Sequence, residues 1–256
     1  MSAVITLLTD FGTADSYVAE MKGVLLRLAP GAVVVDATHD VAPGDIAAGA
    51  FLLGRTWPAF PVGTVHLAVV DPGVGTARRA LAVDAGGHRF VGPDNGLLSR
   101  PLEAPNAKAV SLATPPGASP TFHGRDLFAP AAARLALGAA LRDLGPAVPD
   151  PVRLARPPLV REGVDIVGVV VHVDRFGTLI TNIPGARVAA DAVVRIGPYD
   201  LELKTTFGDV AAGDPVAIVG SGGTVEIAVR DARADVTLGA TRGAAVRATA
   251  AAAEDG

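Results

Sequence analysis

The chain has 256 residues, half of them hydrophobic, and its 22 basic and 26 acidic side chains give a formal net charge of −4. This length holds one large domain or two modest ones. The acidic balance argues against a nucleic-acid-binding protein, because phosphate binding requires a basic face. Cysteine is absent, which excludes disulfides, thiolate metal sites and cysteine nucleophiles.

The sequence also lacks the signals of export and of membrane insertion. Met1 leads almost directly into the apolar run Val4–Leu8, without a basic start or a cleavage segment. No apolar stretch reaches the roughly 18 residues that a membrane-spanning helix requires. We therefore expect a soluble, cytoplasmic protein with no membrane partner.

The first part of the chain alternates strand-like and helix-like segments. Strands are predicted over Val4–Leu8, Ala32–Val35 and Val65–Val70, followed by a hairpin of Leu81–Val83 and Arg89–Val91 about Gly86-Gly87. Helices are predicted from Val18 to Pro30, with Asp15 or Ser16 as N-cap, over Ile46–Leu53, and from Asp126 to about Leu137. This alternation predicts an α/β domain over residues 1–144, with a largely parallel sheet flanked by helices.

The pattern changes near Gly145. Residues 145–163 carry five prolines and several charges, and we interpret them as a linker. Residues 164–256 show no helical periodicity, and Gly, Pro and Asp turns separate short β-type runs. These runs are Val164–Val173, Val193–Ile196, Leu201–Lys204, Val216–Val219, Val225–Val229 and Ala245–Ala248. They predict a smaller all-β domain, a barrel or a sandwich, whose last four residues fray.

Acidic residues follow the three predicted parallel strands: Asp10, Asp36 and Asp71. Ligands gather at the carboxyl ends of such strands, although an acid there also serves as a helix cap or turn former. The segment 70–79 joins Asp71 to Arg78 through a glycine-rich turn. It is neither a dinucleotide fingerprint nor a phosphate loop, and by spacing alone an Asp–Arg pair across a loop is more often structural.

Two further kinds of segment are less decisive. His123 precedes the last predicted helix of the first domain, where a lone histidine is more often a satisfied polar residue than a catalytic one. The other four histidines show no metal-ligand spacing with one another, so we assign no metal. The segments 173–182 and 220–228 in the second domain are also consistent with plain hairpin loops.

Seven segments in order resemble one family, the S-adenosyl-L-methionine hydroxide adenosyltransferases, relatives of the bacterial fluorinase and chlorinase. They are Thr9-Asp-Phe-Gly12 with 17–23, Asp36-Ala-Thr-His39, Val70-Asp-Pro-Gly-Val-Gly-Thr76, Gly92-Pro-Asp-Asn-Gly-Leu97 with Leu98, Phe122-His-Gly-Arg-Asp126, Asp174-Arg-Phe-Gly177 with 181–183, and Glu226-Ile-Ala228. Each is weak alone, and their order along nearly the whole chain makes the resemblance specific.

The resemblance implies an α/β domain followed by a β-barrel, in a homotrimer whose substrate lies between neighbouring subunits. It also implies hydrolysis of S-adenosyl-L-methionine to adenosine and L-methionine, without a cofactor. Asp71, Arg78 and His123 match the catalytic triad of the water-using members, and Asp10 matches the acid that grips the ribose. The other implied substrate-binding residues are Asp15, Asp174 and Ser221 for the methionine amine, Phe207 and Val229 for adenine, and Phe122, Phe176, Thr178 and Glu226.

Two alternatives stay open at this point: a chlorinase-like halogenase, and a non-catalytic protein that binds S-adenosyl-L-methionine or adenosine. Halogenating relatives carry tyrosine and serine where this chain has Asp71 and Gly124. A carboxylate about 4 Å from a halide would cost roughly 4 kcal/mol at an effective dielectric constant of 20. The chain also departs from the family at Thr178, where relatives usually have an adenine-contacting asparagine, and at Gly44, where an aromatic side chain often covers the substrate.

Overall fold

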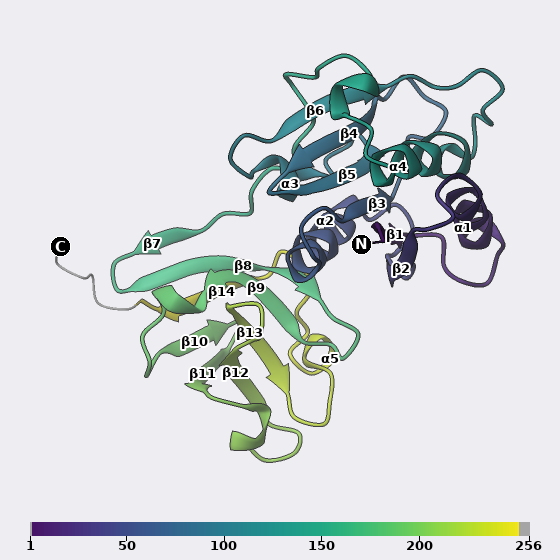
Figure 1. The fold of residues 1–256 in the computed structure, drawn as a ribbon. Helices are drawn as coiled ribbons and strands as arrows, with labels where there is room; N and C mark the ends of the chain where they lie inside the picture. Colours follow the sequence, from purple (N-terminus) through teal and green to yellow (C-terminus); the bar gives the residue numbers. More distant parts are fainter. Residues whose placement is uncertain (1, 251–256) are drawn as a thin grey trace. The chain divides into compact units, whose positions relative to one another are not determined.

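The structure, a computed structural model, describes residues 2–250 and divides into two compact units (Figure 1). The first unit ends at Leu154 and the second begins at Ala155, so the division falls within the predicted linker. The last four residues, for which the sequence predicts fraying, lie outside the described residues. No helix in the described part of the chain is long and apolar enough to cross a membrane.

The first unit is built on a six-stranded sheet with the order β2-β1-β3-β5-β4-β6. Its strands are β1 (Val4–Thr9), β2 (Val33–Thr38), β3 (Val65–Val69), β4 (Ala80–Ala85), β5 (His88–Pro93) and β6 (Lys108–Leu112). The strands β2, β1, β3 and β5 run parallel to one another. The strand β4 is antiparallel to both of its neighbours, β5 and β6. The predicted hairpin is confirmed. The sequence did not predict β6, and Asp36 lies inside β2 rather than after it.

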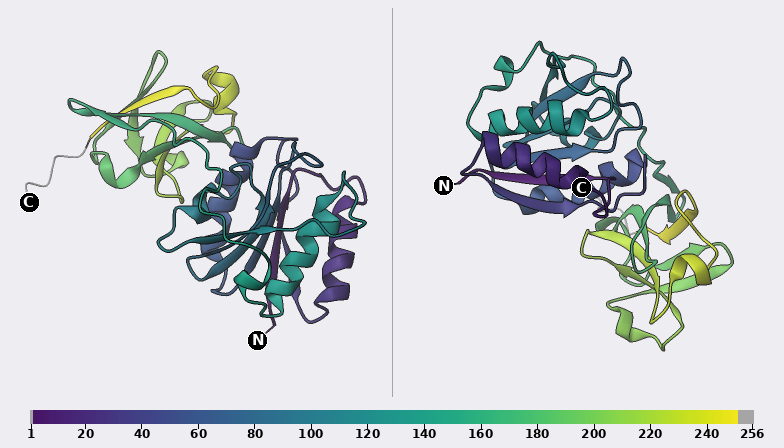
Figure 2. Two further views of the ribbon diagram at one scale, coloured as in Figure 1. Left: turned by 90° about the horizontal axis from the view of Figure 1, so that it is seen from above. Right: turned by 90° about the vertical axis from the view of Figure 1, so that its right-hand side faces the viewer.

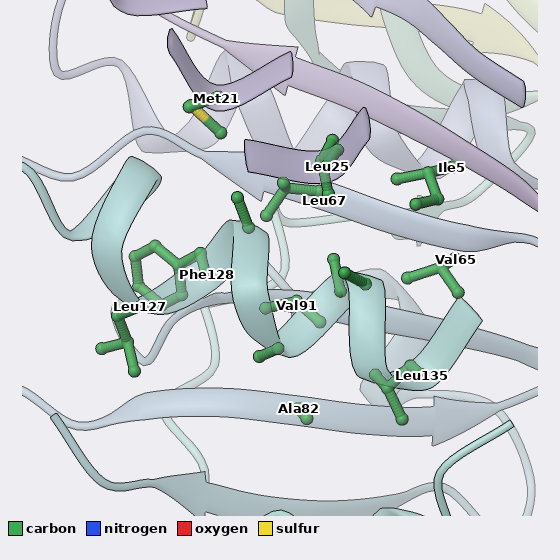
Figure 3. Packing of buried hydrophobic residues seen from close by; sticks show 14 of the residues in the cluster. Ile5, Met21, Leu25, Val65, Leu67, Ala82, Val91, Leu127, Phe128 and Leu135 are labelled. Atoms are coloured by element: carbon green, nitrogen blue, oxygen red, sulfur yellow. The ribbon is translucent and has the colours of Figure 1, made fainter. Parts of the chain in front are cut away.

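Helices cover both faces of this sheet, as predicted. The helices are α1 (Tyr17–Leu28), α2 (Ile46–Thr56), α3 (Ser99–Leu102) and α4 (Ala129–Ala136), with short turns η1 (Trp57–Ala59) and η3 (Leu141–Asp143). Figure 2 shows α1 and α4 side by side over one face. Their buried side chains, among them Met21, Leu25 and Leu135, pack in one cluster with Ile5 and Leu67 of the sheet (Figure 3). The helices α2 and α3 bury Leu53 and Leu102 against the other face.

An ion-pair network attaches the end of the first unit to its sheet. Arg79 Nε donates to Asp94 Oδ2 at 2.6 Å, and its Nη1 donates to Asp150 Oδ1 at 2.7 Å. The other oxygen of Asp94 accepts from the backbone N–H of Val152 at 2.7 Å. Residues around 150–154 therefore belong to the first unit, although their proline-rich composition is typical of a linker.

The second unit is a closed barrel, which confirms the predicted all-β class and selects the barrel. Seven strands form the ring: β8 (Asp165–Val173), β9 (Leu179–Pro184), β10 (Val193–Ile196), β11 (Tyr199–Lys204), β12 (Pro215–Val219), β13 (Thr224–Val229) and β14 (Ala245–Thr249). The pairing of β14 with β8 closes it, and β7 (Val160–Glu162) adds to the outer side of β8. The sequence did not predict β7, β9, the one-turn helix α5 (Ala234–Thr237), or the short turns η4 (Gly185–Arg187) and η5 (Phe207–Asp209).

The first unit also contains a buried chain of imidazoles. Thr6 Oγ1 lies 2.8 Å from His66 Nδ1, and His66 Nε2 lies 3.2 Å from His88 Nδ1. His66 is fully buried, between the rings of Phe60 and Phe90. Burial, and secondarily the charge of His88, lowers the pKa of His66 to about 3. The folded protein therefore holds this imidazole neutral well below the pH at which an exposed histidine becomes charged.

We expect His66 to make the protein sensitive to acid. Below about pH 6.5 the unfolded chain binds a proton at this imidazole, whereas the folded chain does not until the pH approaches 3. The contribution of His66 to the stability of the fold is therefore fully present above about pH 6.5. Between that pH and about 3, each lower pH unit removes about 1.4 kcal/mol from the free energy of unfolding. Denaturant unfolding of wild type and His66→Asn at pH 7, 5.5 and 4.5 measures this slope, and equal slopes would contradict the prediction.

Candidate active site

The carboxylate of Asp71 and the guanidinium of Arg78 form a buried, two-pronged ion pair. Asp71 follows β3, the strand at the centre of the parallel part of the sheet, and Arg78 closes the same loop. Arg78 Nε donates to Asp71 Oδ1 at 2.9 Å and to Oδ2 at 3.1 Å, and Arg78 Nη2 also donates to Oδ2. The side chain of Arg78 is only 10% exposed and that of Asp71 only 4%. Such geometry fixes the carboxylate plane, because the guanidinium is a rigid, planar donor.

The same arginine reaches His123, which the chain brings in from 45 residues away. Arg78 Nη2 lies 2.8 Å from His123 Nδ1, and a guanidinium nitrogen only donates hydrogen bonds. His123 Nδ1 is therefore an acceptor, and the neutral ring carries its proton on Nε2. Burial, followed by the positive charge of Arg78, lowers the pKa of His123, while the charges of Asp71 and Asp126 oppose the shift. The arrangement therefore favours a neutral imidazole.

Two local features hold this triad together. The guanidinium carbon of Arg78 lies 5.2 Å from the centre of the Phe128 ring, and the His123 ring meets that ring edge-on at 6.5 Å. His123 is the N-cap of a π-helical turn, η2 (Gly124–Phe128), which continues into α4. The wider turn places His123 and Phe128 next to the same guanidinium. Turns of this kind are frequent at functional sites.

Glycine at position 75 is required where the Asp71–Arg78 loop meets the segment before His123. Gly75 has φ +77, and a β-carbon on it would lie 2.6 Å from the carbonyl oxygen of Pro120. No side chain fits this approach without moving one of the two segments. The conformation of Gly75 therefore determines how close Arg78 comes to His123.

An aromatic cluster borders the triad. Phe122 packs edge-on against Phe11 at 6.0 Å and against Tyr17 at 5.4 Å, and the guanidinium carbon of Arg125 lies 5.0 Å from the Phe122 ring. Gly124 lies beneath this cluster, where a β-carbon would come within 3.2 Å of the Phe122 ring and 3.1 Å of Met21. A serine here would press on the cluster.

Asp10 follows β1 beside this cluster. Its Oδ2 accepts a hydrogen bond of 2.7 Å from the backbone N–H of Gly44, which has φ +74. The left-handed backbone explains why no aromatic side chain stands at position 44 in this chain. Asp15 is exposed in the turn before α1, where Ser16 occupies the N-cap position; the Ser16 hydroxyl donates to Glu20 at 2.7 Å.

Most of the expected binding residues of the second unit gather at one end of the barrel. Asp174 Oδ1 accepts from the backbone N–H groups of Phe176 and Thr178, both at 2.9 Å, which shapes the β8–β9 turn. Phe176 is 77% exposed, whereas Thr178 is buried. The first residue of β9, Leu179, pairs with Ile227 two residues before Val229, so this turn and the end of β13 lie near each other.

Phe207 belongs to the same region. It is half-exposed at the start of η5, whose backbone carbonyls are bound by Arg230: Nη1 donates to Val210 O at 2.7 Å. Arg230 directly follows Val229 in the chain. The structure thus brings Phe207 toward the end of β13, where the resemblance places the adenine.

Ser221 lies at the other end of β13. The β12–β13 turn that contains it meets β9 at its far end, because Thr224 pairs with Pro184. The six residues of β9 span about 20 Å, so the structure does not bring Ser221 and Asp174 together. Between them, Glu226 places its carboxyl group directly over Gly220, where no side chain fits.

Within residues 2–250, no group of three or more His, Asp or Glu side chains is arranged to hold a metal ion.

Two family models match the chain: the SAM hydroxide adenosyltransferase N-terminal domain over residues 5–145 and the C-terminal domain over residues 168–247. The chain belongs to the SAM hydroxide adenosyltransferase family. It is 47% identical to a protein of Salinispora arenicola named (R)-S-adenosyl-L-methionine hydrolase, covering 96% of this chain and 97% of that protein. It is 30% identical to a fluorinase of Actinoplanes, over 88% and 90% of the two chains.

A solved structure shows the same fold. An uncharacterized conserved protein from Thermotoga maritima superposes with a TM-score of 0.88 at 34% identity, covering 96% of this chain and 99% of that one. The resemblance drawn from the seven sequence segments is thereby confirmed.

Sequence reasoning missed three residues that the site depends on. Phe128 stacks on Arg78, Pro120 receives the close approach of Gly75, and His39 hydrogen-bonds behind the Asp10 loop. Phe128 could have been noticed because it lies five residues after His123. His39 could have been noticed because the segment 36–39 is part of the resemblance, although no role was assigned to it.

Substituting Gly75 should damage the site more than an equally left-handed glycine with open space around it. Gly117 has φ +80 and no neighbouring atom within 4 Å of a β-carbon, so it is the matched control. We expect Gly117→Ala to cost about 1 kcal/mol of stability and Gly75→Ala at least about 2 kcal/mol. Denaturant unfolding measures both, and NMR should show a shifted His123 imidazole only in Gly75→Ala. Equal effects of the two substitutions would contradict the close approach.

Proposed function

We propose that the protein hydrolyses S-adenosyl-L-methionine to adenosine and L-methionine, as an adenosine-forming SAM hydroxide adenosyltransferase. The observation that carries this proposal is the Asp71–Arg78–His123 arrangement, in a chain close in sequence to proteins named (R)-S-adenosyl-L-methionine hydrolase. S-adenosyl-L-methionine is the substrate, and the reaction as proposed requires no cofactor.

The reaction is an in-line displacement at the ribose C5′. The oxygen of water forms a bond to C5′ as the C5′–S bond breaks, and the electron pair of that bond goes to sulfur, giving the neutral thioether of methionine. The water must also lose a proton. Holding the water opposite the sulfonium supplies much of the rate enhancement, because a positioned reactant has already lost its translational freedom.

The hydrogen bonds indicate which group accepts this proton. Neutral His123 uses Nδ1 to accept from Arg78, so its Nε2–H is a donor and the ring has no free lone pair. The Asp71 carboxylate has lone pairs beyond those that Arg78 uses. We therefore assign proton acceptance to Asp71, with His123 orienting the water. The transfer occurs late in the displacement, when the attacking oxygen has become acidic.

The same contacts favour water over a halide. The Nε and Nη2 groups of Arg78 are directed at Asp71 and His123, so they do not present a cation to an incoming anion. A halide about 4 Å from the carboxylate would meet a repulsion of roughly 4 kcal/mol at an effective dielectric constant of 20. Arg78 and Asp71 therefore disfavour halogenation.

We further propose that the enzyme is a homotrimer with active sites between subunits, and that it acts in the cytoplasm. Exposed aromatic side chains support the assembly: Phe176 and Phe207 of the second unit are 77% and 45% exposed, as expected of residues that a ligand or neighbouring subunit covers. The cytoplasmic location is supported by the substrate, which cells make and use internally.

Product analysis tests the proposal. We expect the purified protein to convert S-adenosyl-L-methionine to adenosine and methionine in equal amounts, with no 5′-halo nucleoside when chloride or bromide is added. Chromatography with and without halide distinguishes the products. A halo nucleoside formed faster than adenosine would establish a halogenase, and stoichiometric binding without product would establish a binding protein.

Asp71→Asn is the variant that separates chemistry from binding in this experiment. Loss of the proton acceptor should lower turnover by about 10²-fold or more while calorimetry still detects substrate binding. Asp150→Asn is the matched control, since it removes a carboxylate from an arginine, Arg79, on the surface. Turnover by Asp71→Asn at the wild-type rate would remove Asp71 from the mechanism.

The rate should depend on the protonation of His123. Protonation of the ring at Nδ1 places an N–H against the N–H of Arg78 Nη2. The hydrogen bond that orients the His123 ring is then lost. Because the pKa of His123 is lowered, kcat should stay level as the pH falls from 8 to about 6.5 and decline only below that value. In His123→Asn, whose amide oxygen can accept from Arg78 without titrating, this decline should be absent. The same acid limb in both proteins would assign it to another group.

A further inference from the structure

Behind the Asp10 loop lies a chain of polar contacts to which the proposed mechanism gives no role. Thr9 Oγ1 is 2.8 Å from His39 Nδ1, and both side chains are buried, at 0% and 5% exposure. His39 Nε2 lies 3.1 Å from Asp36 Oδ1, in a contact that lacks the alignment of a hydrogen bond. Lys22 Nζ donates to the other oxygen of Asp36 at 2.6 Å.

The donors and acceptors in this chain run in one direction. A carboxylate only accepts, so the His39 nitrogen that faces Asp36 carries the proton. In the neutral ring Nδ1 is then an acceptor, and the Thr9 hydroxyl donates to it. The pKa of Asp36 is lowered: burial opposes the shift, and hydrogen bonding from Lys22 and the contact with His39 outweigh it. The imidazole is thus oriented from one side by a carboxylate that stays charged.

The other end of the chain of contacts reaches the loop that carries Asp10. With its proton directed at His39, Thr9 Oγ1 accepts from the backbone N–H of Phe11 at 3.2 Å. The next backbone N–H, that of Gly12, donates to the carbonyl oxygen of His39 at 2.8 Å. His39 therefore holds the residues on both sides of Asp10, once through Thr9 and once through its own backbone.

We propose that His39 is a positioning residue for the substrate's ribose: acting through Thr9, it fixes the loop that carries Asp10. The loop also places Phe11 against Phe122, the neighbour of His123, so the same contacts support the aromatic border of the triad. The assignment of the ribose to Asp10 rests on the proposed function. The ordering of the Asp10 carboxylate by His39 does not, and it can be measured without a substrate.

The strand β1 supplies its own control for a merely structural role. Thr6 Oγ1 makes a bond of the same length, 2.8 Å, to His66 Nδ1, and Thr6 is 2% exposed. The two threonines thus make the same kind of buried hydroxyl–imidazole bond, three residues apart, and only Thr9 adjoins the Asp10 loop. Thr9→Val and Thr6→Val each remove one such bond while preserving shape and should cost similar stability.

The deciding measurement is amide hydrogen exchange at Gly44, whose N–H is bound by Asp10 Oδ2 at 2.7 Å. We expect Thr9→Val to accelerate this exchange about tenfold over wild type, and Thr9→Ser, which keeps the hydroxyl, to restore most of the protection. In Thr6→Val, exchange at Gly44 should change only as much as global stability does. Equal acceleration in Thr6→Val and Thr9→Val would overturn the proposal.

Ligand binding gives the second readout. In Thr9→Val, the Kd for adenosine measured by calorimetry and the KM for S-adenosyl-L-methionine should each rise about tenfold, with a smaller change in kcat. In Thr6→Val, both values should stay near those of wild type. If wild type binds adenosine yet forms none, the proposed hydrolysis fails and the positioning role stands. An unchanged adenosine Kd in Thr9→Val would overturn the role in ribose binding.

Two substitutions of His39 divide its contacts. His39→Asn keeps an acceptor near the position of Nδ1 for Thr9, and His39→Gln keeps a polar group near Nε2 for Asp36. We expect His39→Asn to retain protection at Gly44 and adenosine affinity better than His39→Gln. The opposite order would show that the contact with Asp36, and not the bond to Thr9, orders the loop.

Discussion

The guanidinium of Arg78 is the group on which the active site depends. Its Nε and Nη2 groups bind Asp71, and Nη2 also binds His123. One planar side chain therefore sets the position of Asp71 relative to His123, which lies 45 residues after Arg78 in the chain. The pair is almost wholly buried, and burying a carboxylate without a partner would cost several kcal/mol. Asp71 and Arg78 are thus held in place because each compensates the charge of the other, and His123 is held by its hydrogen bond to the same guanidinium.

This constraint reaches back into the fold. Asp71 is placed by β3, the central strand, and His123 by the π-helical turn that opens α4, so the sheet and the helix over it must keep their spacing. Phe128 packs in the core between them (Figure 3). Its ring centre also lies 5.2 Å from the guanidinium carbon of Arg78. Gly75 permits the remaining approach, between the loop and Pro120. The site is therefore a consequence of core packing rather than an addition to the surface.

The sequence predicted the fold class and most strands because buried parallel strands are continuous apolar runs, as in Val65–Val70. It failed where the run is mixed. In β9 the polar residues Thr181 and Asn182 interrupt the apolar run. Thr181 is buried, and its hydroxyl donates to Val225 O at 2.7 Å. In β6, Lys108 and Ser111 interrupt the apolar pattern. Pairing with neighbouring strands, which a local pattern does not report, decides such segments.

The site divides in the same way. Glycine-rich turns after strands pointed to Asp10 and Asp71, and order along the chain selected Arg78 and His123. The directions of the hydrogen bonds were beyond the sequence, because they depend on which imidazole nitrogen meets the guanidinium. That geometry also changes the chemical reading. Once Nδ1 of His123 is committed to Arg78, the proposed mechanism assigns the orientation of the water to the histidine and the role of base to the carboxylate.

The strand β1 shows how function and stability are separated in this fold. Its two buried threonines each bind an imidazole at 2.8 Å. At Thr6 the imidazole lies among aromatic rings and its neutrality supports the core. At Thr9 the imidazole is backed by a charged carboxylate and its bond ends in the loop of Asp10. The same bond therefore serves two purposes, and what distinguishes them is the strand end: in a parallel sheet only the carboxyl end faces a ligand.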